Sequence, residues 1–305
     1  AAGQCNALFG GNTDLQAEKA ITRQAGLVLQ PRFLKGFTGT IDYYQITISN
    51  RIGSIGAQTV LNECIQTGTF CDAIHRGPTG RIWGSRSSFV SDTNINTGFL
   101  KERGVDFAFN YSRYLSDLGL GDSGRLDMAF TGTYLSSRSQ ENAPGIPSFD
   151  CAGLFGLTCG TPNPRWRHKL RTTWLAPSDT IIAGLGVSVQ WRYISSVALD
   201  ANSGNPTLGG QPGPNGGAQT LDQIDGVISK RQYVDLTLTY HLPISTQDVT
   251  LRFGVNNLND RDPPVLSSVG RFPVASPPFG NANTFPGVYD SLGRVFFLGV
   301  NANFR

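Results

Sequence analysis

Four basic side chains alternate with other residues along one short stretch, which reads RWRHKLR from position 165 to 171. In a β-strand, alternate residues share one face. The basic residues are Arg165, Arg167, Lys169 and Arg171. Three carboxylates would face the same way on the two preceding strands. They are Glu102, Asp106 and Asp127. This arrangement favours cross-strand salt bridges, which contribute about 0.2–1 kcal/mol each, and it is also compatible with contact to an anionic ligand or a second domain.

Four of the five cysteines form two closely spaced pairs. Cys64 and Cys71 enclose IQTGTF, and Cys151 and Cys159 enclose AGLFGLT. Both pairs close short loops, as disulfides do in an oxidising compartment. A metal site is the weaker alternative, because zinc-binding cysteines are usually separated by two to four residues. Cys5 is left over, and we expect its partner to lie outside this chain.

The remaining motifs that could indicate an enzyme have no supporting context. The segment GLGDSG (119–124) matches a dinucleotide-binding pattern, but it joins two strands instead of opening a helix. The three histidines are scattered, and the sequence has no HExxH motif and no nucleophile elbow. His168 lies on a strand without a local partner, which is typical of a structural histidine. The sequence therefore predicts no enzyme, no metal site and no cofactor.

Period-2 alternation recurs along all 305 residues and predicts about nine strands. Most of these segments reach the length of about 9–11 residues that a tilted transmembrane strand needs. The expected strands are 20–30, 37–49, 94–114, 124–138, 165–175, 180–194, 231–242, 248–258 and 292–304. The net charge of +3 gives no argument for nucleic acid, and no apolar run approaches the length of a membrane-spanning helix.

Short and long connections alternate between the expected strands. The short ones are 31–36, 115–124, 176–180 and 243–248, and the long ones are 50–93, 139–164, 195–230 and 259–291. Outer-membrane barrels have this pattern, with short periplasmic turns and long external loops. A soluble sandwich is the alternative and has no reason to place every long loop at one end. An odd number of strands leaves unpaired edges, so we expect further strands from a preceding N-terminal portion.

Four segments resemble the TonB-dependent outer-membrane receptors. They are GNTDLQAEKAITRQAGLVLQP (11–31), TIDYYQITISNRIG (40–53), GVDFAFNY (104–111) and the ending LRFGVNNLNDRDPP…YDSLGRVFFLGVNANF. The resemblance covers essentially the whole chain. It implies that residues 1–305 form the last nine strands of a barrel of about 22 strands, in the outer membrane of a Gram-negative bacterium. Receptors of this family often end on an aromatic residue, whereas here Arg305 follows Phe304.

The resemblance also implies a function. A receptor of this family binds a scarce solute outside the cell and imports it when TonB–ExbB–ExbD acts on a plug domain. The plug and the earlier strands would lie outside this chain. A passive porin-type channel and a structural barrel are the alternatives. The stripe of Arg165, Arg167, Lys169 and Arg171, with Asp106 and Asp127, would then face the barrel lumen and the plug.

The long loops offer candidate ligand contacts, because exposed aromatic and arginine side chains often contact ligands. The candidates are Arg81, Trp83, Arg86, Phe279 and Phe285, and each could instead pack within its loop. Helical spacing predicts a short helix within 55–68, whereas loops 195–230 and 259–291 are rich in Gly, Pro and Asn and look adaptable. Amide and aromatic groups suit a neutral, hydroxyl-rich ligand. We therefore expect an oligosaccharide rather than an iron–siderophore complex, although a role as plain polar loops is equally compatible.

Overall fold

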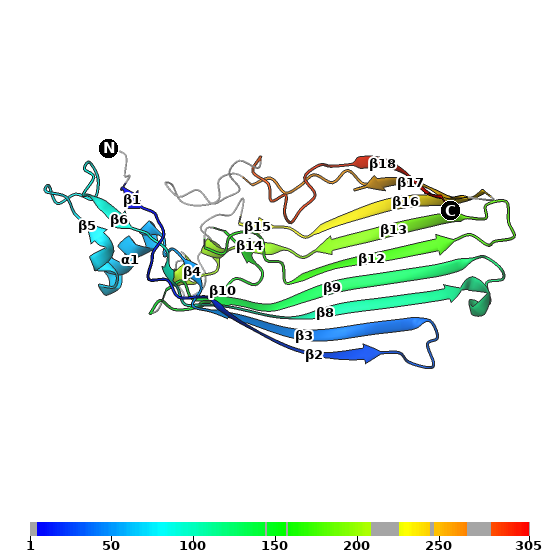
Figure 1. Ribbon diagram of the computed structural model, residues 1–305, viewed down its shortest axis with the longest axis horizontal. Helices are drawn as coiled ribbons and strands as arrows, with labels where there is room; N and C mark the ends of the chain where they lie inside the picture. Colours follow the sequence, from blue (N-terminus) through cyan, green and yellow to red (C-terminus); the bar gives the residue numbers. More distant parts are fainter. Residues whose placement is uncertain are drawn as a thin grey trace. The chain divides into compact units, whose positions relative to one another are not determined.

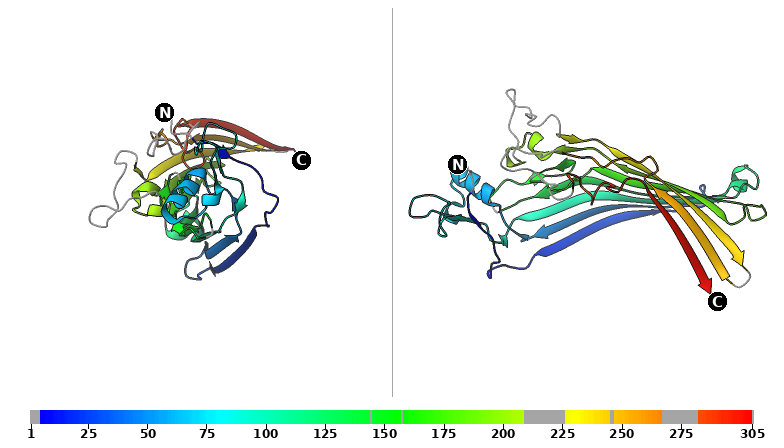
Figure 2. Two further views of the ribbon diagram at one scale, coloured as in Figure 1. Left: turned by 90° about the vertical axis from the view of Figure 1, so that its left-hand side faces the viewer. Right: turned by 90° about the horizontal axis from the view of Figure 1, so that it is seen from above.

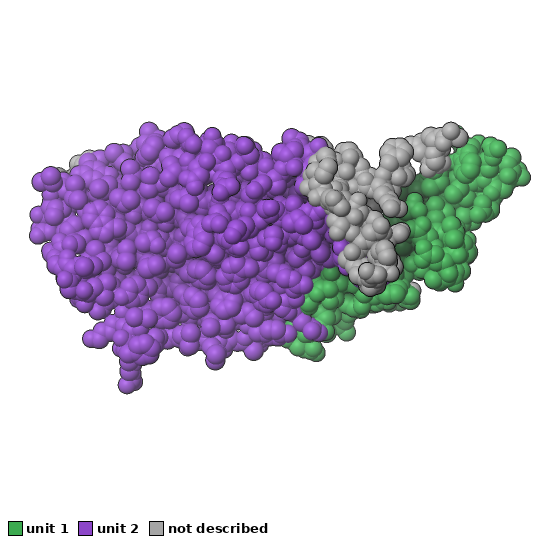
Figure 3. Space-filling view, turned by 180° about the vertical axis from the view of Figure 1, so that it is seen from behind, with its two compact units in different colours: residues 1–23, 45–102, 137–150 green, residues 24–44, 103–136, 151–305 purple. Residues whose placement is uncertain are grey.

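A computed structural model describes residues 5–143, 145–156, 158–208, 226–244, 247–266 and 282–304. About half of the chain, 49%, is strand. The chain divides into two compact units, residues 1–23, 45–102 and 137–150 in unit 1 and residues 24–44, 103–136 and 151–305 in unit 2 (Figure 3). No helix of the described residues is long and apolar enough to span a membrane.

Nine long strands form one sheet in which each strand pairs with its neighbours in sequence (Figure 1). The order is β18-β17-β16-β13-β12-β9-β8-β3-β2, with the short β10 (Phe149–Asp150) also paired to β9. The strands are β2 (Lys19–Leu29), β3 (Phe37–Ser49), β8 (Phe99–Tyr114), β9 (Arg125–Gln140), β12 (Trp166–Leu175), β13 (Leu185–Ile194), β16 (Arg231–Ile244), β17 (Gln247–Asn256) and β18 (Val295–Phe304). This order is an antiparallel meander, and it confirms the number of strands expected from the alternation.

The long connections carry short elements of their own. Unit 1 holds β1 (Ala7–Leu8), β4 (Ile52–Gly53), α1 (Ala57–Thr67), β5 (Ile74–His75), β6 (Phe89–Ser91) and β7 (Ile95–Asn96). Unit 2 holds β11 (Leu154–Phe155), β14 (Val197–Leu199) and β15 (Val227–Ile228), which form a small three-stranded sheet. Single 3-10 turns lie at Cys71–Ala73, Leu115–Leu118, Asp200–Asn202 and Pro206–Leu208.

The helix expected within 55–68 is confirmed as α1, the one α-helix of the described residues. The carboxylate of Asp92 accepts hydrogen bonds from the backbone N–H groups of Gly56, at 2.9 Å, and Ala57, at 3.1 Å. These groups have no partner within a helix, so Asp92 stabilises its first turn. The helix ends at Gly68, whose φ of 75° lies in the left-handed region that favours glycine.

Two expected strands start five residues later than the alternation indicated. The segment 180–184 is a turn, closed by hydrogen bonds from Ala183 N to Thr180 O and from Leu185 N to Ile182 O, each 3.0 Å. Gly184 then has φ 84°, so β13 begins only at Leu185, and the expected strand 180–194 was wrong over its first five residues. Similarly, β8 begins at Phe99 and not at residue 94, because Ile95–Asn96 pairs with β4.

The two faces of the unit 2 sheet differ in chemistry. Cross-strand register places Lys169, Arg192 and Tyr233 side by side on one face, and Leu170, Trp191 and Val234 on the other. The second face exposes large apolar side chains, including Phe296 at 63% and Leu298 at 76%. An exposed apolar face opposite a charged one is what a barrel wall between lipid and lumen requires. Unit 2 forms an open, curved wall (Figure 2), so the sheet fits part of a β-barrel.

Candidate functional site: the inner wall and its loop cluster

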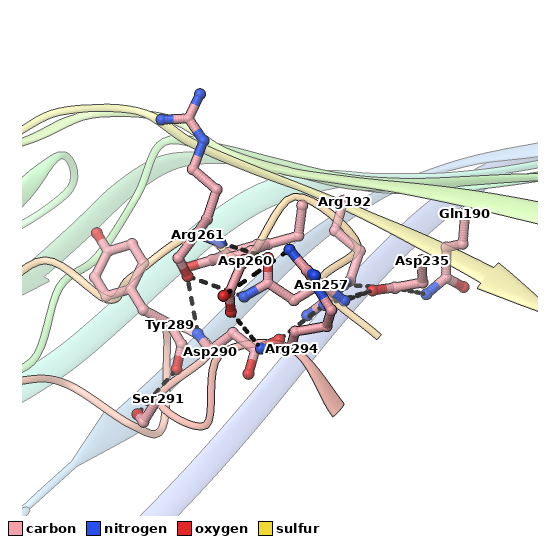
Figure 4. A network of polar contacts seen from close by, with 11 residues as sticks. Gln190, Arg192, Asp235, Asn257, Asp260, Arg261, Tyr289, Asp290, Ser291 and Arg294 are labelled. Atoms are coloured by element: carbon pink, nitrogen blue, oxygen red, sulfur yellow. Dashed lines mark hydrogen bonds and ion pairs between the residues drawn. The ribbon is translucent and has the colours of Figure 1, made fainter. Parts of the chain in front are cut away.

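A network of polar contacts lies on the charged face of the sheet, which we call the inner wall (Figure 4). The Arg192 guanidinium donates two hydrogen bonds of 2.8 Å to the carboxylate of Asp235 and one of 2.9 Å to Asp290. Asp235 also accepts from Gln190 Nε2 at 3.0 Å and from Asn257 N at 2.9 Å. The charge of Arg192 is therefore shared between a strand carboxylate and a loop carboxylate.

The same network closes the turn that follows β17. Asn257 is fully buried, and its φ of 54° suits asparagine better than most residues. Its side chain accepts from Arg261 N and donates to Arg261 O, both at 2.9 Å. The carboxylate of Asp260 then accepts from Arg294 N at 2.8 Å, just before β18. The run of Asn and Asp after Val255 is therefore a turn that joins the start and the end of the last long connection.

A hollow of about 660 Å³ lies beside this network. The residues that line it include Asp106, Thr131, Thr133, Arg167, Lys169 and Arg192, together with His168 and Tyr193. Tyr233 from β16 and Val288 from the last long connection also line it. Asp106 accepts a hydrogen bond of 2.7 Å from the Thr133 hydroxyl. Arg167 and Lys169 are exposed, and neither forms an ion pair with any described residue.

The basic residues of β12 and its start do not form the salt bridges that were expected with Glu102, Asp106 and Asp127. Asp127 binds Arg125 at 2.8 Å, and Glu102 binds Arg138 at 3.0 Å. Arg171 donates to the side chain of Gln190 at 2.9 Å, and Arg165 donates to the carbonyl of Ser136 at 2.8 Å. The expected salt bridges of the stripe are thus not formed among the described residues, because each carboxylate has a nearer partner.

Parts of three long connections pack into one apolar core, which we call the three-loop cluster. Its buried members are Phe155, Val197, Leu199, Ile228, Leu266, Phe285 and Tyr289. The rings of Phe155 and Phe285 meet edge to face, with centroids 6.1 Å apart. Phe285 is only 4% exposed, so in this structure it packs within the loops, the alternative that the sequence left open. These connections were also expected to be adaptable, but the apolar residues between their glycines and prolines build a shared core.

A buried carboxylate and a disulfide brace the three-loop cluster. Asp200 is 1% exposed and accepts backbone hydrogen bonds from Thr158 and Cys159, at 2.9 Å, and from Ala201, at 2.7 Å. Burial raises the pKa of the Asp200 carboxyl, and these backbone bonds oppose the rise. Cys151 and Cys159 form the expected disulfide beside it.

The connection 50–98 in unit 1 is built differently. It contains α1 and the second expected disulfide, Cys64–Cys71. Trp83 is 49% exposed, and the Arg81 guanidinium lies 5.7 Å from its ring centroid, within the range of a cation–π contact. Arg86 is also exposed, so these three candidates remain accessible, whereas Phe279 lies outside the described residues. Cys5 has no disulfide partner among the described residues, and its partner outside the chain stays a prediction.

His168 lies within aromatic side chains on the apolar face of the sheet. Trp166 Nε1 donates a hydrogen bond of 2.8 Å to His168 Nδ1, and the imidazole stacks on Tyr193 with centroids 5.2 Å apart. The Trp191 ring meets it edge to face at 4.6 Å. No described carboxylate or nucleophile accompanies His168 there, and the geometry is that of a packed histidine.

The profile of the family described as TonB dependent receptor-like, beta-barrel, matches residues 2–258. The chain belongs to this family of TonB-dependent receptors. Members of the family, and the solved structures that the chain resembles, are receptors and transporters of the Gram-negative outer membrane and not enzymes. No curated protein matches the sequence.

Solved receptor structures share the fold of this receptor segment. The ferric enterobactin receptor PfeA from Pseudomonas aeruginosa has a TM-score of 0.55 and 13% identity, over 96% of this chain and 32% of its own. The siderophore receptor PirA from Acinetobacter baumannii has a TM-score of 0.52 and 13% identity, over 96% of this chain and 32% of its own. The iron transporter FrpB from Neisseria meningitidis has a TM-score of 0.50 and 14% identity, over 97% of this chain and 33% of its own. The chain therefore spans about a third of the receptors it resembles.

Sequence reasoning identified Arg167, Lys169 and Asp106 of the hollow but missed the Arg192 network that borders it. Asp235 and Arg192 alternate within strands like ordinary lumen residues, and Asp290 is 98 positions from Arg192. The one available signal was the closing motif of the resemblance, which contains Asn257, Asp260 and Asp290. Its polar residues now have identified partners in the network.

Proposed function

We propose that the whole protein is an outer-membrane receptor that binds a scarce solute outside the cell and imports it into the periplasm with energy coupled through TonB. The observation that supports this most strongly is the nine-strand sheet with an apolar and a charged face, in a chain of the TonB-dependent receptor family. The apolar face contacts outer-membrane lipid, and the charged face lines the lumen.

The other parts of the transporter come from the portion of the protein that precedes this segment. It supplies the remaining strands, which satisfy the edges of β2 and β18, and the plug that contacts TonB–ExbB–ExbD. Unpaired strand edges cannot remain in hydrocarbon, because each unsatisfied backbone group costs several kcal/mol there. The solute is an iron–siderophore complex or an oligosaccharide, the two classes that the family and the loop composition suggest.

Whole-cell uptake tests this function. Cells that express the full-length receptor should accumulate a labelled substrate, and deletion of tonB or collapse of the proton-motive force should abolish this accumulation. Fractionation should place the receptor in the outer membrane. Substrates are screened by growth on iron-chelate or polymeric-sugar media, with and without the receptor gene. Uptake that persists at full rate without TonB would instead identify a passive porin-type channel.

A further inference from the structure

We propose that two short turns at one end of the sheet insert apolar side chains into the phospholipid leaflet that faces the periplasm. The turns are 115–124, between β8 and β9, and 176–184, between β12 and β13, and both belong to unit 2 (Figure 1). This inference rests on the proposed function, in which the apolar face of the sheet contacts outer-membrane lipid. It extends the lipid contact beyond the strands, to residues outside the sheet.

Four large apolar side chains of these turns, which we call the turn patch, are exposed. They are Leu118, Leu120, Ile181 and Ile182, and their exposed fractions range from 39% for Ile182 to 100% for Ile181. A single exposed leucine or isoleucine is ordinary on a protein surface. Four of them on two short turns need a different explanation, because turns that face water usually consist of Gly, Pro, Asn, Asp and Ser.

The two turns lie side by side. Gly124, the last residue of the first turn, comes so close to the end of β12 that an added Cβ would clash with the Leu175 carbonyl and lie 3.3 Å from Pro177 Cδ. The second turn is closed by a hydrogen bond of 2.9 Å from Ala176 N to Leu185 O. The turn patch therefore belongs to one continuous part of the rim.

The first turn is held against the apolar face of the sheet. Trp174 and Leu170 are four residues apart on β12, so they share this face. Cross-strand register places Leu126 and Val187 beside Trp174. The indole Nε1 of Trp174 donates a hydrogen bond of 2.8 Å to the carbonyl of Ser123. The turn thus reaches the side of the wall that contacts lipid, and a protein bound there would have to displace that lipid.

The charged residues of the turns are compatible with a lipid surface. Arg113 and Asp117 form an ion pair of 3.2 Å, so together they add no net charge beside Leu118. Asp122 and Asp179 are exposed. Their carboxylates can stay among hydrated head groups while the leucine and isoleucine side chains reach the acyl boundary, as in amphipathic segments that lie at a membrane surface.

The length of β12 agrees with this placement. Trp166 and Trp174 lie near its two ends, eight residues apart, which corresponds to about 26 Å along the strand. At the tilt of about 45° of a transmembrane strand, this is a depth of about 19 Å. The apolar band of such barrels is about 25 Å tall. With Trp166 at the outer boundary, where tryptophan is favoured, the band extends about 6 Å beyond Trp174, to the level of the turns.

Photo-cross-linking in whole cells tests the turn patch. The full-length receptor would carry p-benzoylphenylalanine in place of Leu120 or Ile181, and mass spectrometry would identify what each position captures. We expect phospholipid adducts at both positions, at about the yield of the same substitution at Leu298 on the apolar face of β18. Ile65 is the matched control, because it is also exposed but lies on α1 in a long connection. Its phospholipid adduct should be about tenfold weaker or less, which is the preference of such a side chain for apolar surroundings.

Three results would overturn the turn patch. They are capture of a protein instead of lipid, no adduct at either turn, and a lipid yield no higher than at Ile65. Capture of a protein would identify the turns as a docking surface for a periplasmic partner or a second copy of the receptor. Presence in the outer-membrane fraction verifies that each variant is assembled, and Leu118 and Ile182 replace a position whose variant fails this check.

The yield at Leu298 separates this inference from the proposed function. Lipid adducts at Leu298 without adducts at the turns would contradict the turn patch alone. Loss of the adduct at Leu298 as well would contradict the lipid-facing sheet, and therefore the outer-membrane receptor itself.

Discussion

The three-loop cluster and the connection 50–98 bury their apolar side chains by different means. The cluster draws seven buried residues from separate segments between positions 155 and 289. The connection 50–98 buries only Val60 and Val90 among its large apolar residues, together with the polar Ser88, Asp92 and Thr97. A core shared between segments should be lost as a unit, whereas a connection with few buried apolar side chains should loosen locally.

The substitution with the largest expected effect on this difference is Phe155→Ala. Truncation of a buried phenylalanine costs about 3–5 kcal/mol, and Phe155 is fully buried against Phe285. Hydrogen exchange on the full-length receptor should therefore show about a 100-fold or greater loss of amide protection in all three connections of the cluster. The control is Trp83→Ala at a half-exposed site, which should change stability by about 0.5 kcal/mol or less. Loss confined to residues 151–163 would show that the cluster is not cooperative.

Removing the two disulfides compares the regions more directly, because the cross-links close loops of nearly equal length, with separations of 7 and 8 residues. By chain entropy each should contribute about 2.5 kcal/mol. In C151A/C159A we expect protection to fall in the partner connections as well, near Leu199 and Phe285. In C64A/C71A the fall should stay within about 57–75. Identical spreading in both variants would remove the distinction between the regions.

Asp290→Asn should produce a smaller effect at the point where the cluster joins the inner wall. Arg192 would lose one charged partner and keep Asp235, so we expect a cost of about 1.5 kcal/mol, seen as lower protection in residues 283–294. Asp117→Asn is the control, because its ion pair with Arg113 is exposed and should be worth about 0.5 kcal/mol or less. Equal effects of the two variants would contradict an anchoring role for Asp290.

The smallest expected effect is a pH dependence of the cluster through Asp200. Burial raises the folded-state pKa of this carboxyl above its unfolded value. The folded cluster therefore binds the proton more tightly, and its stability should fall as pH rises from the unfolded pKa through the folded one. Exchange of the Thr158 and Cys159 amides, corrected for intrinsic rates, measures this. The variant D200N should flatten the profile, and protection that increases with pH over that window would refute the assignment.

Much of the sheet was predictable because its signal is local. In β12, the alternation of Arg167, Lys169 and Arg171 with Trp166, His168 and Leu170 fixes both the strand and its faces. The start of β13 was not predictable in this way, because residues 180–184 alternate in sequence but form a turn that Gly184 completes.

The three-loop cluster could not be predicted from the sequence, for a different reason. Phe155 and Phe285 touch across 130 positions, and each stands among glycines and prolines that indicate a loop. No periodicity links two such residues, so only the fold shows that Phe285 is buried. The lack of carboxylate partners for Arg167 and Lys169 among the described residues could not be predicted from the sequence either. The alternation of basic residues can be read from the sequence. The ion pairs of Asp127 with Arg125 and of Glu102 with Arg138, which leave the basic residues without these partners, cannot.

The shared core of the cluster also has an evolutionary consequence. A change of volume at Phe155 leaves a void or a clash against Phe285, so selection acts on the two positions jointly although they lie in different loops. Among related receptors, residue sizes at these positions should covary. Insertions should collect instead in connections such as 50–98, where few buried apolar side chains depend on one another.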